Sequence, residues 1–311
     1  MVSGTVKALR SMSAGDLRRK LLQRVRHPRL IAGDLRRIYV NLRADGVRLY
    51  AAYHRMRNSH GRVYSIKRRN CRMWLPISWG DTVALRRFGL FEPLIFDTLS
   101  QLVHPGFIAV ELGSCYGAFT IHLSRLVGPT GRVYAFEPFP KYFVITKRNI
   151  QLNGLSNVRL VNQAVGPASV QQVEFDAEAT NPYSSLHQIS GLDYSMRTGT
   201  FESTARPAVT IPCVSLLDFL QREQCMMDLL FMDIEGCEIA VLKDIRSLLA
   251  GQKRPVVFFE LHRGFYRAGD QEWLEGFFAN CGYSTEIVGN HLLCVPLDMP
   301  VPQSAAGLRM E

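Results

Sequence analysis

The chain has 311 residues, of which 47% are hydrophobic and 21% are charged, and its formal net charge is +10. This length suffices for one large α/β domain plus an extension, and no run of about eighteen apolar residues is present to span a bilayer. The seven cysteines include no Cys-x-x-Cys pair, which disfavours a disulfide framework or a zinc site and favours reduced thiols. No hydrophobic signal peptide opens the chain, so we expect a cytoplasmic protein, with the membrane surface as an alternative.

Positive charge is concentrated in residues 1–73, which hold 19 Lys and Arg residues and three acids. Apolar residues at three- and four-residue spacing predict basic amphipathic helices after Asp16 and Asp34. Their arginines could face anionic lipid headgroups or a phosphorylated carrier, face solvent only, or bind nucleic acid. The Arg-rich start also resembles an organellar transit peptide. We expect a basic, helical extension over residues 1–73, a main domain over 74–300 and a tail over 301–311.

Helical spacing over residues 90–103 predicts a helix that covers the sheet or the cofactor mouth. A strand, a glycine turn and a helix follow. The apolar run at 107–112 carries one acid, Glu111, and leads into a turn from Gly113 to Gly117. A second apolar run ends at Glu137, twenty residues after Gly117. At this spacing a mononucleotide-binding unit brings a carboxylate to a ribose, so the pattern predicts a cofactor that contains a nucleoside.

The glycine turn also indicates which cofactor binds. It has neither the Gly-x-Gly-x-x-Gly pattern of dinucleotide sites nor the Lys of a phosphate loop. Cys115 and Tyr116 occupy positions where a pyrophosphate would need bare backbone. S-adenosylmethionine carries an adenosine but no phosphate, and we therefore predict it as the cofactor. A nicotinamide or flavin site, or a turn that needs glycine only for close packing, are the alternatives.

A helix over 141–152 and a third strand over 157–161 are expected next. Ligands of doubly wound sheets lie at the carboxyl ends of strands, so Asn162 or Gln163 could meet the adenine, or either could be an ordinary turn residue. Residues 176–208 are rich in Ser, Thr, Gly and Asn and lack periodicity, which predicts a substrate lid or a disordered loop. The loop residues that could contact a polar substrate are Tyr183, Ser184, Ser185, His187 and Tyr194.

A continuous apolar run at 229–232 predicts a central parallel strand. Asp233 stands at its carboxyl end, Glu235 in the following turn and Glu238 in the first turn of a helix. Three carboxylates are therefore expected at the edge of the sheet where the cofactor's sulfonium would lie. Acids near a helix N-terminus also offset its dipole, an alternative that fits Glu238 best.

The last strands surround a single histidine. The run at 255–261 predicts a strand, with Glu260 inside it and His262 at its end. A strand-end histidine beside carboxylates could serve as a general base, although a lone histidine is often structural. A helix over 270–280 and a hairpin over 283–295 are expected to complete the sheet.

Six ordered motifs resemble one family over about residues 90–296. They are VELGSCYGAFT, GRVYAFEP, KRNIQLNGLSNV, VTIPCVSLLDFL, LLFMDIEGCEIAVL and VVFFELH. Together they resemble the FkbM-type S-adenosylmethionine-dependent methyltransferases. The resemblance implies an α/β fold like that of class I methyltransferases, with a doubly wound, mostly parallel seven-stranded sheet. It also implies O-methylation of sugars, polyketides or related natural products.

The resemblance assigns roles to single residues. It places Glu111 and the two glycines in the cofactor loop, Glu137 at the ribose, and the later acids in an Asp-x-Glu-Gly-x-Glu signature. Glu111 stands where Asp is common, and Ser114-Cys115 replace a frequent Ala-Asn. The predicted cofactor-binding residues are Glu111, Gly113, Ser114, Tyr116, Gly117, Glu137, Gln163 and Asp233. The predicted catalytic residues are Asp233, Glu235 and His262.

We therefore expect an O-methyltransferase that displaces the sulfonium methyl in line with the hydroxyl of a sugar, glycolipid or related natural product, with His262 or Asp233 as base. Asp233, Glu235 and Glu260 could instead hold a divalent metal, but their spacing is not a recognised cage and no metal site is predicted. A ribose methyltransferase of nucleic acid and a non-catalytic scaffold are the alternatives. The expected partners are a glycan or small-molecule acceptor, lipid-linked or free, and a membrane surface that the extension contacts. No [DNS]-P-P-[YFW] motif follows the fourth strand, which disfavours methylation of base amino groups in nucleic acid but not methylation of its ribose.

Overall fold

The computed structural model describes residues 62–66, 71–75, 92–176, 186–188, 208–266 and 269–299. The chain divides into two compact units, and all of these residues belong to the unit formed by 61–75 and 84–311. The helices predicted after Asp16 and Asp34 and the predicted tail lie outside the described residues. Within the described residues, no helix is both long enough and apolar enough to cross a membrane.

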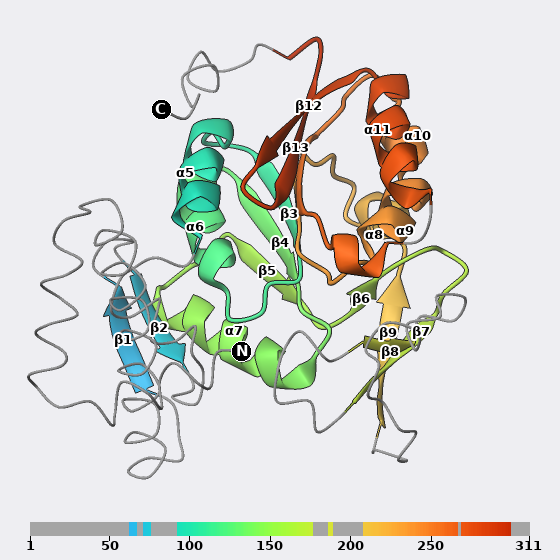
Figure 1. Cartoon of the computed structure of the whole chain (residues 1–311). Coiled ribbons are helices and arrows are strands. Elements are labelled where there is room, and N and C mark those ends of the chain that lie inside the picture. Colours follow the sequence, from blue (N-terminus) through green and yellow to red (C-terminus); the bar gives the residue numbers. More distant parts are fainter. Residues whose placement is uncertain are drawn as a thin grey trace, which may run out of the picture. The chain divides into compact units, whose positions relative to one another are not determined.

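A seven-stranded sheet forms the centre of this unit (Figure 1). Its strands are, in spatial order, β12 (Tyr283–Val288), β13 (His291–Pro296), β11 (Val256–Glu260), β10 (Leu229–Met232), β3 (Ile108–Leu112), β4 (Arg132–Phe136) and β5 (Val158–Val161). Strand β13 is antiparallel to both of its neighbours, and the other adjacent pairs are parallel. The predicted doubly wound, mostly parallel sheet is confirmed.

Helices cover both faces of the sheet. They are α5 (Pro93–Leu102), α6 (Ala118–Val127), α7 (Pro140–Leu152), α8 (Leu216–Arg222), α9 (Glu238–Asp244), α10 (Arg246–Leu249) and α11 (Asp270–Asn280). Side chains of β10 show the two layers, because successive strand residues point to opposite faces. Leu230 and Met232 pack in the core under α8, α9, α10 and α11, whereas Leu229 and Phe231 pack in the core under α5 and α6. A strand buried on both faces explains the continuous apolar run in the sequence.

The order of the strands contains a reversal between β3 and β10. From β3 the chain builds outward through β4 and β5, and it then returns to the other side of β3 to form β10 and β11. Ligands of doubly wound sheets bind outside the carboxyl ends of the strands at such a reversal. Gly113, which follows β3, and Asp233, which follows β10, therefore stand at the expected place.

A short hairpin differs from the predicted helical extension. Strands β1 (Arg62–Ile66) and β2 (Cys71–Leu75) pair antiparallel, and alternate residues of β2 are buried. The backbone of β2 is held by Asn149 of α7, whose Oδ1 accepts from Trp74 N at 2.6 Å and whose Nδ2 donates to Trp74 O at 3.1 Å. The predicted boundary at residues 73 and 74 thus falls inside a strand, and the hairpin belongs with the main domain rather than with the extension.

A second, four-stranded sheet lies outside the sequence prediction. Its strands are, in spatial order, β6 (Ala164–Val165), β9 (Ala208–Val214), β7 (Gln172–Asp176) and β8 (Leu186–Gln188). Strand β8, which contains His187, lies within the stretch that lacks periodicity in the sequence. Tyr183, Ser184, Ser185 and Tyr194 lie outside the described residues, so their predicted substrate contacts stay predictions. All seven cysteines are free thiols.

Candidate active site

The turn after β3 requires glycine because it touches the end of β10. Gly113 has a φ of 88°, in the left-handed region. A Cβ at this position would lie 2.0 Å from the carbonyl oxygen of Asp233, far inside any allowed contact. The amides of Gly113 and Ser114 both donate to Phe136 O at 3.0 Å. The glycine loop therefore packs against the backbone of Asp233.

Glu137 holds the glycine loop from the neighbouring strand. Its side chain is buried, and Oε2 accepts from the amide of Cys115 at 2.7 Å while Oε1 accepts from the amide of Phe139 at 3.0 Å. Burial raises the pKa of Glu137 to about 8, although these two hydrogen bonds act in the opposite direction. Each carboxyl oxygen has two lone pairs, so both can accept a further hydrogen bond. The predicted contact with a ribose is compatible with this position and stays a prediction.

Glu111 lies beneath the loop. It is 1% exposed, and the hydroxyl of Thr120 on α6 donates to its Oε2 at 2.6 Å. Burial raises the pKa of Glu111 to about 7, against the effect of the Thr120 hydrogen bonds. This position lets Glu111 support the loop from below by tying β3 to α6. Its predicted role in cofactor binding stays a prediction.

The remaining predicted cofactor residues have different surroundings. Ser114 is buried, and its hydroxyl has no hydrogen-bond partner among the described residues. Tyr116 packs against the buried side chains of β2 and forms an edge-to-face contact with Tyr142 at 5.7 Å. Gln163 is half-buried between β5 and β6. Its neighbour Asn162 donates to the carbonyl oxygens of both Glu137 and Pro138 and fixes their turn, a role that the sequence does not reveal.

Asp233 and Glu235 occupy the turn between β10 and α9. The amide of Asp233 donates to Leu112 O at 3.0 Å, which extends the pairing of β10 with β3 by one residue. Glu235 has a φ of 55°, which is unusual for a residue with a side chain. Burial and the charge of Glu260 raise the pKa of Asp233 well above its ordinary range. Burial also raises the pKa of Glu235 to about 7, although His262 opposes the shift.

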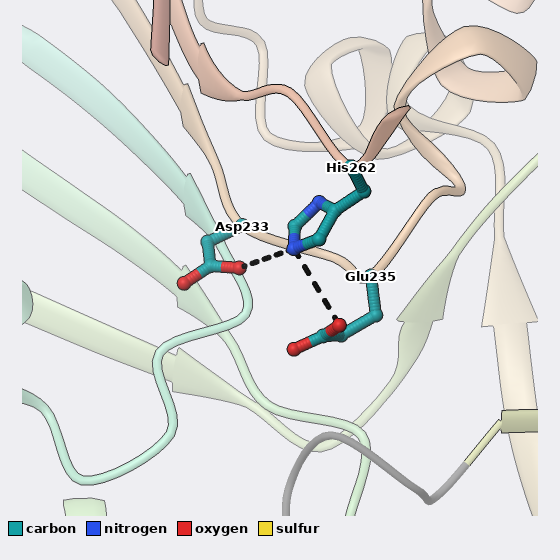
Figure 2. Close-up of side chains that lie close together, drawn as sticks. All are labelled: Asp233, Glu235 and His262. Atoms are coloured by element: carbon teal, nitrogen blue, oxygen red, sulfur yellow. Dashed lines mark ion pairs between the residues drawn. The ribbon is translucent and has the colours of Figure 1, made fainter. Parts of the chain in front are cut away.

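His262 lies among these carboxylates, as Figure 2 shows. Its Nε2 is 3.5 Å from Asp233 Oδ1, 3.5 Å from Glu235 Oε2 and 3.6 Å from Glu260 Oε2. Its Nδ1 is 2.9 Å from Oε1 of Glu238, a residue that is fully buried. Burial lowers the pKa of His262, but the hydrogen bond to Glu238 and the nearby negative charges outweigh it and raise the pKa to about 9.

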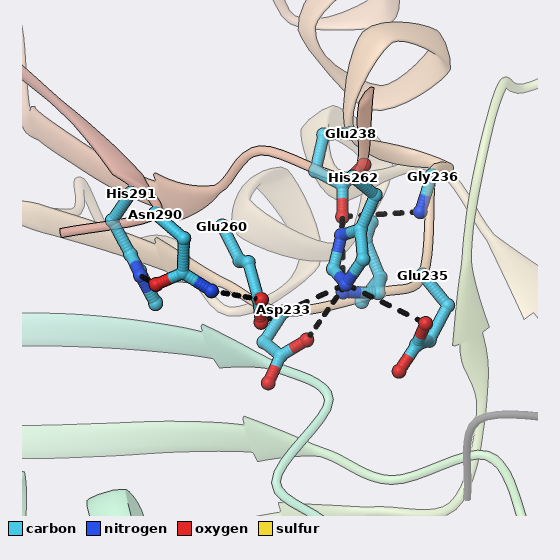
Figure 3. A network of polar contacts seen from close by, with 9 residues as sticks. Asp233, Glu235, Gly236, Glu238, Glu260, His262, Asn290 and His291 are labelled. Carbon is cyan, nitrogen blue, oxygen red and sulfur yellow. Dashed lines mark hydrogen bonds and ion pairs between the residues drawn. The ribbon is translucent and has the colours of Figure 1, made fainter. Parts of the chain in front are cut away.

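A polar chain continues from this histidine to the β12–β13 turn (Figure 3). Asn290 donates from Nδ2 to Glu260 Oε1, and its Oδ1 lies 2.9 Å from Nδ1 of His291. His291 is fully buried against Phe231 and Phe258. Burial and the nearby His262 lower the pKa of His291 to about 4. Asn290 and His291 carry no signal in the sequence, because a turn residue and a lone histidine are common without a function.

The three predicted catalytic residues are therefore neighbours. One oxygen each of Asp233 and Glu235 and one nitrogen of His262 all lie within 4.8 Å of one another. Glu238, the acid that the helix-dipole alternative fits best, contacts the imidazole directly.

The model of the Methyltransferase FkbM domain family matches residues 111–285, more than half of the 311-residue chain. The chain belongs to this family. The matched region is therefore a methyltransferase domain, and the predicted cofactor, S-adenosylmethionine, agrees with this assignment. The site fits such a cofactor. It offers two glycines with positive φ, the buried Ser114 hydroxyl that has no partner among the described residues, and the Glu137 carboxyl with lone pairs to spare.

Other known proteins resemble parts of this FkbM-domain methyltransferase. The tRNA (adenine(58)-N(1))-methyltransferase catalytic subunit TRM61 of Cryptococcus neoformans is 34% identical over 91 residues, which cover 29% of this chain. The matched segment spans about a fifth of that relative, 21% of its length. The precorrin-6y C5,15-methyltransferase of Geobacter metallireducens GS-15 is 15% identical, with 66% of this chain and 87% of that chain covered and a TM-score of 0.39. An O-methyltransferase from Bacillus cereus is 16% identical, with coverage of 65% and 79% and a TM-score of 0.36.

Proposed function

We propose that this methyltransferase acts on oxygen, at a hydroxyl of a sugar, glycolipid or related natural product. The observation that carries the proposal is the contact between the glycine loop, residues 113–117, and the turn that holds Asp233 and Glu235. Because the Asp233 carbonyl occupies the space of a Gly113 side chain, the carboxylates that follow β10 start directly beside the cofactor loop. An acceptor that reaches the transferred methyl group must also meet these carboxylates.

The chain's own residues would act on the proton of the acceptor. When bound, S-adenosylmethionine supplies an electrophilic methyl group, and an alcohol attacks poorly until its proton leaves. A carboxylate whose pKa lies near the operating pH is the best base for that proton, with an effect of about 10²–10⁴-fold. Glu235, with a pKa of about 7, meets this requirement. His262, with a pKa of about 9, carries a proton at neutral pH and would orient the carboxylates rather than act as the base.

The chemistry of the turn supports a hydroxyl over an amino group of a base as acceptor. The residues after β10 are Asp233-Ile234-Glu235-Gly236, and no Pro-Pro-aromatic motif for base amino groups stands there. The similarity to a tRNA methyltransferase covers 29% of this chain and only 21% of that relative. RNA is therefore included in the transfer assay as a comparison acceptor. The basic residues of 1–73 suit an acceptor attached to an anionic or lipid carrier, and we propose that they hold such a carrier at a membrane surface.

Two measurements test the proposal. Calorimetric titration of the full chain with S-adenosylmethionine and, separately, with NADH is expected to give saturable binding of the first alone. Transfer from a labelled methyl donor is then measured on free glycans, lipid-linked sugars and RNA. We expect product on a carbohydrate hydroxyl, and Glu235→Gln is expected to lower turnover at least tenfold while cofactor binding is kept. Labelling of RNA alone, or full turnover by the variant, would contradict the proposal.

A further inference from the structure

The active-site cluster contains a mixed set of donor atoms that points beyond acid–base chemistry. Asp233 and Glu235 come from the turn after β10, and His262 comes from the end of the adjacent strand β11. His262 Nε2 is 3.5 Å from one oxygen of each acid (Figure 2). Two donors bound at about 2.1 Å to one ion can be up to about 4.2 Å apart. Both spacings therefore allow the imidazole and each carboxylate to share an ion.

The imidazole is held in the orientation that metal-binding histidines need. Its side chain is 10% exposed, and the fully buried Glu238 contacts the other ring nitrogen, Nδ1, at 2.9 Å. Glu238 is itself fixed, because the amides of Ile234 and Gly236 donate to the same oxygen (Figure 3). A carboxylate on the outer nitrogen is the usual partner of a histidine that binds a metal. A metal ion would displace the Nε2 proton of His262, and this partner then directs the freed lone pair toward Asp233 and Glu235.

The charge of the cluster is also unbalanced. Asp233, Glu235, Glu238 and Glu260 all form their ion pairs with His262, and no Lys or Arg of the described residues joins them. Four carboxylates thus share one imidazole in a largely buried site. Buried charges are normally paired or coordinate metals. A divalent cation would supply the missing positive charge.

We propose that Asp233, Glu235 and His262 bind a divalent metal ion that activates the acceptor hydroxyl. The inference deepens the proposed O-methyl transfer and rests on it. Two carboxylate oxygens and one imidazole nitrogen suit Mn²⁺ or a similar first-row ion better than Ca²⁺, which prefers oxygen alone. Three protein donors leave positions open for water and for the acceptor oxygen, as in other catalytic metal sites.

The ion would change how the proton leaves, because Glu235 would then bind the ion instead of acting as the base. An acceptor oxygen bound to the ion would become more acidic, and the freed proton would pass to solvent water. The electron pair of the O–H bond then forms the new O–C bond to the methyl group. The C–S bond breaks, and its electron pair stays on sulfur. The products are the methyl ether, S-adenosylhomocysteine and one proton.

Titration with Mn²⁺ tests the metal site on the full chain after treatment with a chelator. Bound Mn²⁺ loses the electron paramagnetic resonance signal of the free ion, so stoichiometry and affinity can be read directly. We expect one ion per chain, and at least tenfold weaker binding in Glu235→Gln and in His262→Gln. Glu286→Gln, which removes an exposed carboxylate on β12, is the matched control and is expected to bind as the wild type does.

Calorimetry and activity separate this inference from the proposed function. The chelated wild type is expected to bind S-adenosylmethionine and to regain at least tenfold in transfer rate when Mn²⁺ is added. Cofactor binding with full transfer in the presence of chelator would overturn the metal site and leave the O-methyltransferase intact. Mn²⁺ bound with equal affinity by wild type and both site variants would also overturn it. A chain that binds no S-adenosylmethionine in either state would instead overturn the proposed function.

Discussion

Glu238 is fully buried at the start of α9, and one of its oxygens serves three groups. The amides of Ile234 and Gly236 donate to Oε1, and His262 Nδ1 lies 2.9 Å from the same atom. The residue therefore sets both the shape of the turn after β10 and the direction of the imidazole. It is a positioning residue, because it acts on the reacting groups through His262 and through the turn that carries Glu235.

Replacing Glu238 should separate orientation from cofactor binding. Glu238→Gln keeps an oxygen acceptor but removes the negative charge beside His262. Outer partners of this kind typically change activity by about 10–100-fold. We expect the transfer rate to fall by that factor, while calorimetry gives an affinity for S-adenosylmethionine within about twofold of the wild type. A variant with the wild-type rate would show that the Glu238 charge does not orient the site.

Glu111 makes the stability of the protein depend on pH. Its pKa is about 7 in the folded chain and near 4.5 otherwise. Between these values the unfolded chain has released the proton and the folded chain still holds it, so the free energy of unfolding falls as pH rises. Each pKa unit corresponds to about 1.4 kcal/mol. Glu137, with a pKa of about 8, acts in the same direction.

The Glu111→Gln variant should reduce this dependence. The free energy of unfolding of the wild type should fall between pH 5 and pH 8. We expect this fall to be roughly 2 kcal/mol smaller in the variant. Urea unfolding followed by circular dichroism at the two pH values measures it. His291, with a pKa lowered to about 4, acts in the opposite direction below about pH 6.5 in both proteins, so it cancels in the difference. Equal losses in both proteins would contradict the assignment of a buried proton to Glu111.

At the scale of elements, the two turns that follow β3 and β10 form one unit. Gly113 lies in one turn and Asp233 begins the other, and no Cβ fits between them. Alanine at position 113 would clash with the backbone of Asp233, and it would also have to adopt a φ of 88°. Non-glycine residues in such conformations cost about 1–3 kcal/mol before any clash is counted.

We expect Gly113→Ala to destabilise the chain by at least that amount and to weaken S-adenosylmethionine binding at least tenfold. Gly276→Ala is the matched control. A Cβ at Gly276 meets nothing within 4 Å on helix α11, so this change should stabilise the chain by about 0.5–1 kcal/mol. Thermal unfolding and calorimetry on both variants give the comparison. Normal cofactor affinity in a folded Gly113→Ala protein would show that the loop tolerates a shifted β10 turn.

The sequence predicted the elements that carry a local pattern. Apolar runs such as 229–232 and the acids that follow them are visible in the chain, and so was the approach of His262 to Asp233. The hairpin β1–β2 was not predicted, because it depends on Asn149, a residue seventy-five positions from Trp74. The second sheet was not predicted for the same reason, since β7 pairs with β9 across the aperiodic stretch. Contacts with residues distant in the sequence, rather than local propensity, determine the structure of these segments.

At the scale of the whole molecule, charge is divided between the extension and the rest of the chain. Residues 1–73 carry a net charge of about +16, whereas the whole chain carries +10. Residues 74–311 are thus net acidic, and the site itself adds four carboxylates around one histidine. A free anionic acceptor would be repelled by such a site. An uncharged sugar hydroxyl would suit the carboxylates better.

This division predicts salt-dependent binding of the full chain to anionic vesicles. Each Lys or Arg near an anionic surface contributes about 1 kcal/mol, and salt screens the attraction. We expect sedimentation with vesicles that contain phosphatidylserine at low salt, release at about 0.5 M salt, and no sedimentation with neutral vesicles. Reversal of two charges, in Arg36→Glu with Arg37→Glu, should weaken binding at least tenfold. Exposed Arg222→Glu on α8 is the control for a charge change outside the extension. Equally strong binding to neutral vesicles, or binding unchanged by the two reversals, would show that the arginines of the extension do not supply the contact.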